Sequence, residues 1–150
     1  MGVNIQKYSL RIVKETGGRY DLNKVIKSPK DALKTFVEVL DMNIRPEEVF
    51  AIITLDIKNQ ITGVFEVSVG TLFSSYVHPR EVFKRAILQN SAAIILGHNH
   101  PSGIPDPSKD DINITKKLMN GGDILGIDVL DHVIVGNNET YISMKEKGVI

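Results

Sequence analysis

Two short, almost uninterrupted apolar segments restrict the folds that this chain can adopt. They are Val49–Ile57 and Ala92–Leu96. Apolar runs of this length are typical of β-strands buried on both faces, whereas a strand with one exposed face alternates apolar with polar residues. Such strands need helices packed on the sheet. We therefore expect an α/β (or α+β) domain built on a mixed sheet.

Local signals place further elements around these two strands. Alternating apolar residues predict a strand at Tyr8–Val13. Ser28, Pro29 and Asp31 suit the N-cap, first and third positions of a helix with a capping box, and so predict a helix start. The remaining expected elements are strands at Ile61–Val69, Ile127–Val135 and Thr140–Ser143, a helix beginning at Pro79, and a helix that begins at Ser108 and ends near Gly121–Gly122. Together they give a single domain with about three helices.

The composition excludes several classes of protein. With 150 residues, of which 42% are hydrophobic and 24% charged, the chain has the balance of an ordinary soluble domain. No apolar run approaches the roughly 20 residues that cross a bilayer, and the N-terminus lacks a signal-peptide core, so a cytoplasmic protein is expected. The absence of cysteine excludes disulfides and thiolate metal ligands. A formal net charge of zero argues against a general DNA-binding surface.

A pair of histidines follows the second apolar segment. In a strand, residues two positions apart point to the same face, so His98 and His100 can converge on one ion. Neutral imidazole is a good zinc ligand, with Zn–N distances of about 2.0–2.1 Å. Pro101 ends the strand and places the pair at the rim of the sheet. The competing interpretation is a pair of hydrogen-bonded histidines that caps a strand end.

A third ligand is expected from the helix that begins at Ser108. With Ser108 as N-cap, Asp111 lies in the first helical turn, close to the end of the strand. Two histidines and one carboxylate would leave the fourth position of one zinc ion open for water, which is the pattern of catalytic zinc. Asp111 could instead be only the capping-box partner of Ser108, and the two roles are expected to exclude each other in part. Asp110 is expected to face solvent.

A catalytic zinc site also needs a general base, and Glu66 is the candidate. Glu66 is the only acidic residue between Ile57 and Glu81, and it lies within an otherwise apolar segment. The competing interpretation is an ordinary solvent-facing residue, because Val64, Glu66 and Ser68 share one side of a strand.

These residues form a pattern that resembles a known family. His98 to Gly103, followed by Ser108 to Asp111, resembles the JAMM (MPN-plus) metal motif, in which His-x-His is followed after seven residues by Ser-x-x-Asp. The surrounding segments resemble the bacterial RadC family in particular, over roughly residues 30–145. They are Gly70-Thr71, Val77–Phe83 and Asp131–Gly136.

The resemblance implies a zinc-dependent hydrolase with a cytidine-deaminase-like layout. Residues 30–150 would form a JAB/MPN-like domain, and residues 1–29 an N-terminal extension with one strand. By the family pattern, His98, His100 and Asp111 would hold the zinc ion. Ser108 would stabilise the oxyanion, and an upstream glutamate, mapped to Glu66, would be the base. Full-size RadC-like proteins often carry an N-terminal helix-hairpin-helix region, so this chain is expected to be the catalytic domain alone.

The motif and the resemblance lead to hypotheses from two classes of function. The leading hypothesis is a zinc metallopeptidase or isopeptidase that acts on a peptide or protein substrate through a metal-activated water. The alternative is a DNA-repair-associated or protein-recruiting module with a structural or vestigial metal, although the charge does not support direct DNA binding. A metal-dependent nuclease is the weakest hypothesis for the same reason. His78 and His132 are expected to be structural, with His132 orienting a ligand or neighbour.

Overall fold

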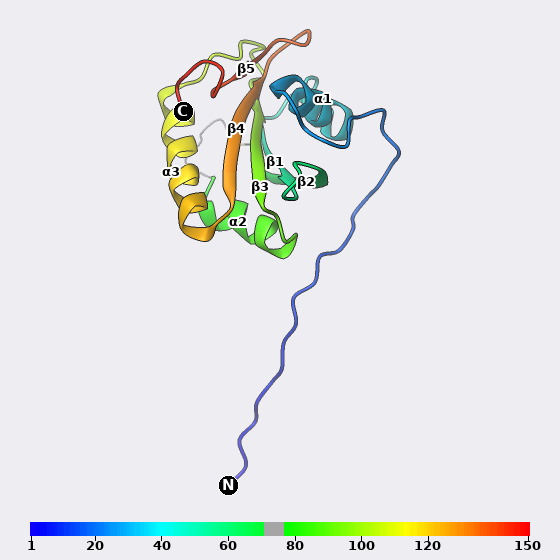
Figure 1. Cartoon of the computed structure of the whole chain (residues 1–150), viewed down its shortest axis with the longest axis vertical. Helices are drawn as coiled ribbons and strands as arrows, with labels where there is room; N and C mark the ends of the chain where they lie inside the picture. The colour runs from blue at the N-terminus through cyan, green and yellow to red at the C-terminus, as the bar shows by residue number, and fades with distance from the viewer. Residues whose placement is uncertain (71–76) are drawn as a thin grey trace.

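The computed structural model describes residues 1–70 and 77–150 (Figure 1). Within this part the elements, in chain order, are α1 (Pro29–Leu40), β1 (Val49–Leu55), β2 (Ile61–Val69), α2 (Pro79–Leu88), β3 (Ala93–Asn99), α3 (Lys109–Leu125), β4 (Asp128–Val135) and β5 (Tyr141–Ser143). Thr71, which belongs to one of the shorter motifs above, lies outside the described residues. No helix within the described ranges is both long enough and apolar enough to cross a membrane.

The strands form one mixed sheet in the order β2-β1-β3-β4-β5. The pairs β1–β2, β1–β3 and β4–β5 are antiparallel, and β3–β4 is parallel. The parallel pair needs a crossover, and α3 supplies it, because it lies between β3 and β4 in the chain. The expected α/β domain with a mixed sheet and three helices is therefore confirmed.

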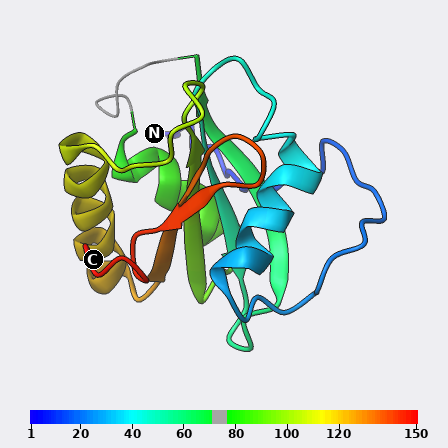
Figure 2. The same ribbon diagram turned by 90° about the horizontal axis from the view of Figure 1, so that it is seen from above.

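Helices cover both faces of this sheet. Figure 2 shows α1 on one side and α2 with α3 on the other. Two separate apolar clusters correspond to the two faces, one containing Phe36 of α1 and the other Phe83 of α2. Every residue of β1 and β3 is buried, as their apolar composition predicts. Gly97 allows α1 to pack this closely, because a Cβ there would lie 2.4 Å from the Phe36 ring.

Helix starts agree closely with the sequence-based predictions. Ser28 is the N-cap of α1 and forms a reciprocal capping box with Asp31. His78 is the N-cap of α2, and its side chain accepts a hydrogen bond from the backbone N–H of Arg80. A capping box depends on only four consecutive residues, which explains why these boundaries can be read locally.

The strand predicted at Tyr8–Val13 is wrong. Residues 1–20 form no helix or strand, and Figure 1 shows this segment running away from the rest of the chain. The Tyr8 and Leu10 side chains are 85% and 81% exposed. The chain meets the sheet later, at a bridge between Val25 and Gln60. Alternating apolar residues satisfy the pattern of a strand, but a strand also needs a hydrogen-bonded neighbour.

The predicted end of α3 near Gly121–Gly122 is also wrong, because the helix continues to Leu125. It ends at Gly126, which has a left-handed φ of 70° and donates its N–H to the Gly122 carbonyl oxygen. A Cβ on Gly122 would lie 2.4 Å from the carbonyl oxygen of Ile127. Glycine at 122 therefore permits a close approach between α3 and the residues leading into β4, and does not mark the helix end.

Two neighbouring glycines of α3 should respond differently to alanine. Gly122→Ala should lower the free energy of unfolding by about 1–3 kcal/mol, because its Cβ would overlap a backbone oxygen. Gly121→Ala is the matched control: its Cβ would meet only the Phe83 side chain, at 3.1 Å, and alanine gains about 1 kcal/mol of helix propensity. Urea unfolding of both variants measures the difference. Equal stability of the two variants would contradict the packing assigned to Gly122.

Candidate metal centre

Four side chains converge at the end of β3. They are Glu48, His98, His100 and Asp111, and one ligand atom from each lies within 4.8 Å of the others. The two imidazole Nε2 atoms are 2.9 Å apart. Asp111 Oδ1 lies 3.3 Å from His98 Nε2, and Asp111 Oδ2 lies 3.4 Å from His100 Nε2. Glu48 Oε1 is more distant, 4.0 Å from His98 Nε2.

These atoms suit a zinc ion. Zinc in proteins takes nitrogen and oxygen ligands at about 2.0–2.2 Å, so two ligand atoms of a tetrahedral site are about 3.3 Å apart. Both separations between Asp111 and the histidines match this value. The shorter separation between the histidine nitrogens requires a small outward movement of one ring. The group of two histidines and two carboxylates could therefore hold a metal ion, as in a JAMM-type site.

Strand alternation and pairing bring these residues together. His98 and His100 are two positions apart at the end of β3 and share a face, as predicted. Phe50 of β1 pairs with His98 in the antiparallel ladder, so Glu48, two residues earlier, lies level with His100. The loop after Pro101 returns α3 to the same edge. His100 Nδ1 is 2.7 Å from the Ile104 carbonyl oxygen, which fixes that ring against the loop.

Asp111 caps α3 and faces the histidines at the same time. Its Oδ2 accepts a 2.7 Å hydrogen bond from the Ser108 backbone N–H, and Ser108 Oγ accepts one from the Asp111 N–H. Its Oδ1 remains directed at His98. The cap uses Oδ2 and leaves Oδ1 directed at His98, so this geometry allows one carboxylate to cap the helix and face the histidines together. Ser108 is the N-cap, and Asp110 is exposed, as expected.

The local charges shift the pKa values of the group. Burial alone would raise the pKa of Asp111, but hydrogen bonds from His100 and His98 outweigh it and hold the pKa well below its usual range. Burial likewise opposes protonation of His100, yet contacts with Asp111 and the Ile104 carbonyl raise its pKa. Burial raises the pKa of Glu48, and the charge of Asp111 adds to this effect, although His98 and His100 partly oppose it. Glu48 therefore holds a proton more readily than an exposed glutamate does.

Glu66, predicted as the base beside the histidines, is not in this group. It pairs with Ala51 in the β1–β2 ladder, and Ala51 packs in the cluster on the α1 face. His98 pairs with Phe50, which packs in the cluster on the opposite face. Glu66 instead forms a 2.7 Å ion pair with Arg45. The physical reason for the correction is strand alternation, since neighbouring residues of β1 point to opposite sides of the sheet.

Asn99, between the two histidines, points the other way and holds the segment that carries Glu48. Its Oδ1 accepts a 2.7 Å hydrogen bond from the Val49 N–H. Its Nδ2 donates to the carbonyl oxygens of Glu47, at 2.9 Å, and Arg45, at 3.2 Å. Three bonds from one buried side chain therefore fix the backbone on both sides of Glu48. Glu48 directly precedes a buried strand, but nothing in the local sequence distinguishes it from Glu47.

His132 lies behind the group and is fully buried on β4. Its Nε2 is 2.7 Å from His98 Nδ1, and its Nδ1 is 2.5 Å from Thr115 Oγ1. Burial lowers the pKa of His132 well below its usual value, with a further contribution from His98, so its ring is neutral. His132 contacts one of the four clustered residues but is not one of them.

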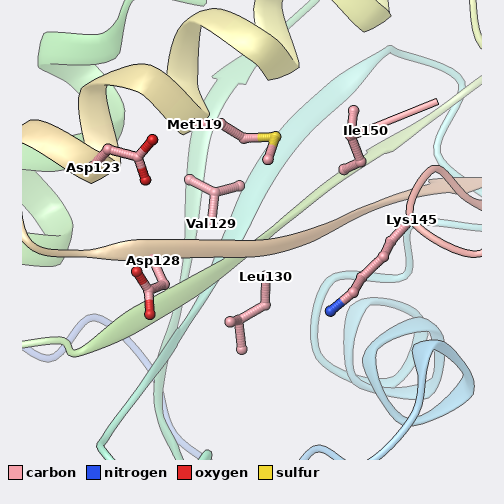
Figure 3. A pocket seen from close by; sticks show the side chains of 7 residues that line it. All are labelled: Met119, Asp123, Asp128, Val129, Leu130, Lys145 and Ile150. Atoms are coloured by element: carbon pink, nitrogen blue, oxygen red, sulfur yellow. The ribbon is translucent and has the colours of Figure 1, made fainter. Parts of the chain in front are cut away.

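A separate pocket lies away from these residues. It has a volume of about 250 Å³ and is formed by the second half of α3, the beginning of β4 and the C-terminal segment (Figure 3). Asp128, in its lining, pairs with Ala93 at the start of β3, whereas His98 lies at the other end of that strand. The pocket and the four-residue group therefore occupy opposite ends of the β3–β4 pair.

Removing the Asn99 side chain should destabilise the protein. Asn99→Ala leaves the buried Val49 N–H without its acceptor, and we expect a loss of about 1–3 kcal/mol in the free energy of unfolding. Asn23→Ala is the control, because the Asn23 bond to Asp31 is exposed and its loss should change stability by less than about 0.5 kcal/mol. Denaturant unfolding measures both. A wild-type midpoint for Asn99→Ala would show that the segment around Glu48 is held by other contacts.

Comparison with known proteins identifies one family over most of the chain. The model of the RadC-like JAB domain family matches residues 26–149. A UPF0758 protein of Desulfitobacterium hafniense (strain DSM 10664 / DCB-2) is 53% identical over 126 residues, which cover 84% of this chain and 54% of that relative. A UPF0758 protein of Alkaliphilus oremlandii is 48% identical over 155 aligned positions, covering 99% of this chain and 66% of that relative. The chain thus spans about half to two thirds of the length of the curated relatives it matches. It belongs to the RadC-like JAB domain family.

Proposed function

We propose that this chain is a zinc-dependent hydrolase that cleaves an amide bond, in a peptide or an isopeptide. The observation that carries the proposal is the convergence of Glu48, His98, His100 and Asp111 at the end of β3. His98, His100 and Asp111 would hold the metal, because their atoms have the shorter mutual separations. Membership of the RadC-like JAB family supports hydrolytic chemistry at this site.

Glu48 replaces Glu66 as the proposed general base. It is the most distant member of the group, 4.0 Å from His98 Nε2, and its side chain is 18% exposed, as is that of His100. A carboxylate in this place would be available to accept a proton from a water molecule in the group without being a close ligand. Its raised pKa also suits a group that must take up a proton and release it again.

These positions support the following division of roles. A bound zinc ion supplies a Lewis acid that polarises the scissile carbonyl and makes water more acidic. Glu48 takes one proton from the attacking water and delivers it to the leaving amine nitrogen as the C–N bond breaks. Ser108 Oγ accepts a hydrogen bond from the Asp111 N–H. The hydroxyl hydrogen of Ser108 can therefore be donated to the negative oxygen that develops on the substrate. Asp111 keeps the first turn of α3 in place for that contact.

The two glutamates provide a direct test of the base. Glu48→Gln should reduce hydrolysis of a peptide or isopeptide substrate by about 10²–10⁴-fold while zinc remains bound, because the amide cannot accept the proton. Glu66→Gln is the matched control and should retain wild-type activity, since it breaks only the ion pair with Arg45. Rates with and without chelator, and zinc content by atomic absorption, give the comparison. Full activity in a metal-free His98→Ala/His100→Ala variant would refute the mechanism.

Zinc affinity should depend on pH through His100. Its pKa is raised in the metal-free protein, so a proton competes with the metal below that pKa. The apparent affinity should be greatest above the raised pKa and fall about tenfold for each pH unit below it, the slope expected for one proton. Competition with a chromogenic chelator from pH 5.5 to about 8.5 measures this. His100→Ala should bind more weakly with a shallower slope. An unchanged slope in that variant would assign the proton to another group.

A further inference from the structure

A chain of buried polar groups connects two residues of the metal centre through the protein interior. His98 Nδ1 lies 2.7 Å from His132 Nε2, and His132 Nδ1 lies 2.5 Å from Thr115 Oγ1. Thr115 Oγ1 in turn lies 2.6 Å from the backbone carbonyl oxygen of Asp111. His132 and Thr115 are both completely buried. The chain therefore joins β3, β4 and the first turn of α3 without the help of surface water.

Metal binding by His98 fixes the direction of every hydrogen bond in this chain. The Nε2 atom that faces the centre must be free of hydrogen to bind a metal, which leaves the hydrogen of a neutral ring on Nδ1. That Nδ1–H donates to His132 Nε2. A neutral His132 then carries its own hydrogen on Nδ1 and donates it to Thr115 Oγ1. The Thr115 hydroxyl hydrogen can then be donated to the Asp111 carbonyl oxygen.

The opposite direction is incompatible with a metal ion on His98. In that arrangement His132 donates from Nε2 to His98, and Thr115 donates its hydroxyl hydrogen to His132. The Asp111 carbonyl oxygen then loses the hydroxyl donor, and His98 carries its hydrogen on Nε2, in the centre. The same four groups thus have two self-consistent hydrogen-bond directions, of which only one leaves a ligand atom available.

We propose that His132 and Thr115 are positioning residues that hold His98 in the tautomer required for zinc. His132 supplies the acceptor for His98 Nδ1–H. Thr115 keeps His132 in the matching tautomer, because its hydroxyl donates a hydrogen bond to the Asp111 carbonyl oxygen and so accepts one from His132 Nδ1–H. The inference rests on the proposed role of His98 as a metal ligand but not on the reaction or the substrate. Hydrogen-bond partners of metal-bound histidines commonly affect metal affinity by about 10–100-fold.

A purely structural role for His132 makes different predictions. The His132 ring packs edge-on against Phe50, with ring centroids 5.5 Å apart, so its loss could act through packing alone. Variants that keep or remove the hydrogen bond to His98 separate the two roles. His132→Gln retains an amide oxygen that can accept from His98, whereas His132→Leu fills space without an acceptor. Val133→Ala is the packing control, because Val133 is equally buried but lies in the cluster on the other face of the sheet.

Zinc affinity, measured by competition with a chromogenic chelator, is the first readout. We expect His132→Leu to bind zinc about 10–100-fold more weakly than wild type, and His132→Gln to stay within about threefold. Thr115→Val should lose part of the affinity and Thr115→Ser should keep it, because serine retains the hydroxyl. Val133→Ala should unfold more easily without a change in affinity. Wild-type affinity in His132→Leu would overturn the inference while leaving the proposed function intact.

Long-range ¹H–¹⁵N NMR of the imidazole rings in the zinc-loaded protein is the second readout. His98 and His132 should both carry their hydrogen on Nδ1, a signature that packing alone would not produce. A hydrogen on His132 Nε2 in the zinc-loaded protein would contradict the proposed direction. If the wild-type chain binds no zinc, the proposed function fails together with this inference. If the wild-type chain binds zinc and His132→Leu binds it equally well, only the inference fails. The two failures are therefore distinguishable.

Discussion

The antiparallel pairing of β1 with β3 is the constraint on which the centre depends. Both strands are buried on both faces, so a shift of one residue would move every side chain from the apolar cluster on one face into the differently packed cluster on the other. This register sets Phe50 opposite His98 and so brings Glu48 to the histidines. Because residues of β3 alternate, His98 faces the centre while Asn99 faces away and holds the segment that carries Glu48. The requirements of the core thereby bring Glu48, His98 and His100 together at one end of the sheet.

Residues of the centre could be predicted from the sequence where a pattern of a few consecutive residues identifies them, and not where their position depends on contacts between distant segments. The histidine pair and the capping box of α3 were predicted because both are patterns within four consecutive residues. Glu48 could not be found in this way, because its proximity to His98 depends on which strands are neighbours. Glu66 attracts attention in the sequence as an isolated acid in an apolar strand, but in the structure its side chain forms an ion pair with Arg45.

The errors in the fold prediction have the same origin. Apolar alternation at Tyr8–Val13 describes a strand-compatible segment but does not supply a partner, and the segment is exposed. Gly121 and Gly122 have low helix propensity, yet α3 continues through them. Gly122 allows the residues that lead into β4 to pack closely against the helix. In both cases tertiary structure determined the outcome: the first segment has no strand partner, and the second packs as a helix in spite of its low helix propensity. The sheet and three helices were nevertheless predictable, because burial on two faces leaves few arrangements.

Asp111 shows how one side chain can cap a helix and face the histidines of the centre at the same time. One carboxylate oxygen completes the cap of α3, so helix formation itself fixes the side-chain rotamer that directs the other oxygen at His98. The Asp111 carbonyl accepts from Thr115, which contacts His132 behind the same histidine. A displacement of the first turn of α3 would therefore alter both the carboxylate and the hydrogen-bond partner of His98. Part of the geometry of the centre is thus maintained by the Ser108–Asp111 cap, which the helix end requires in any case.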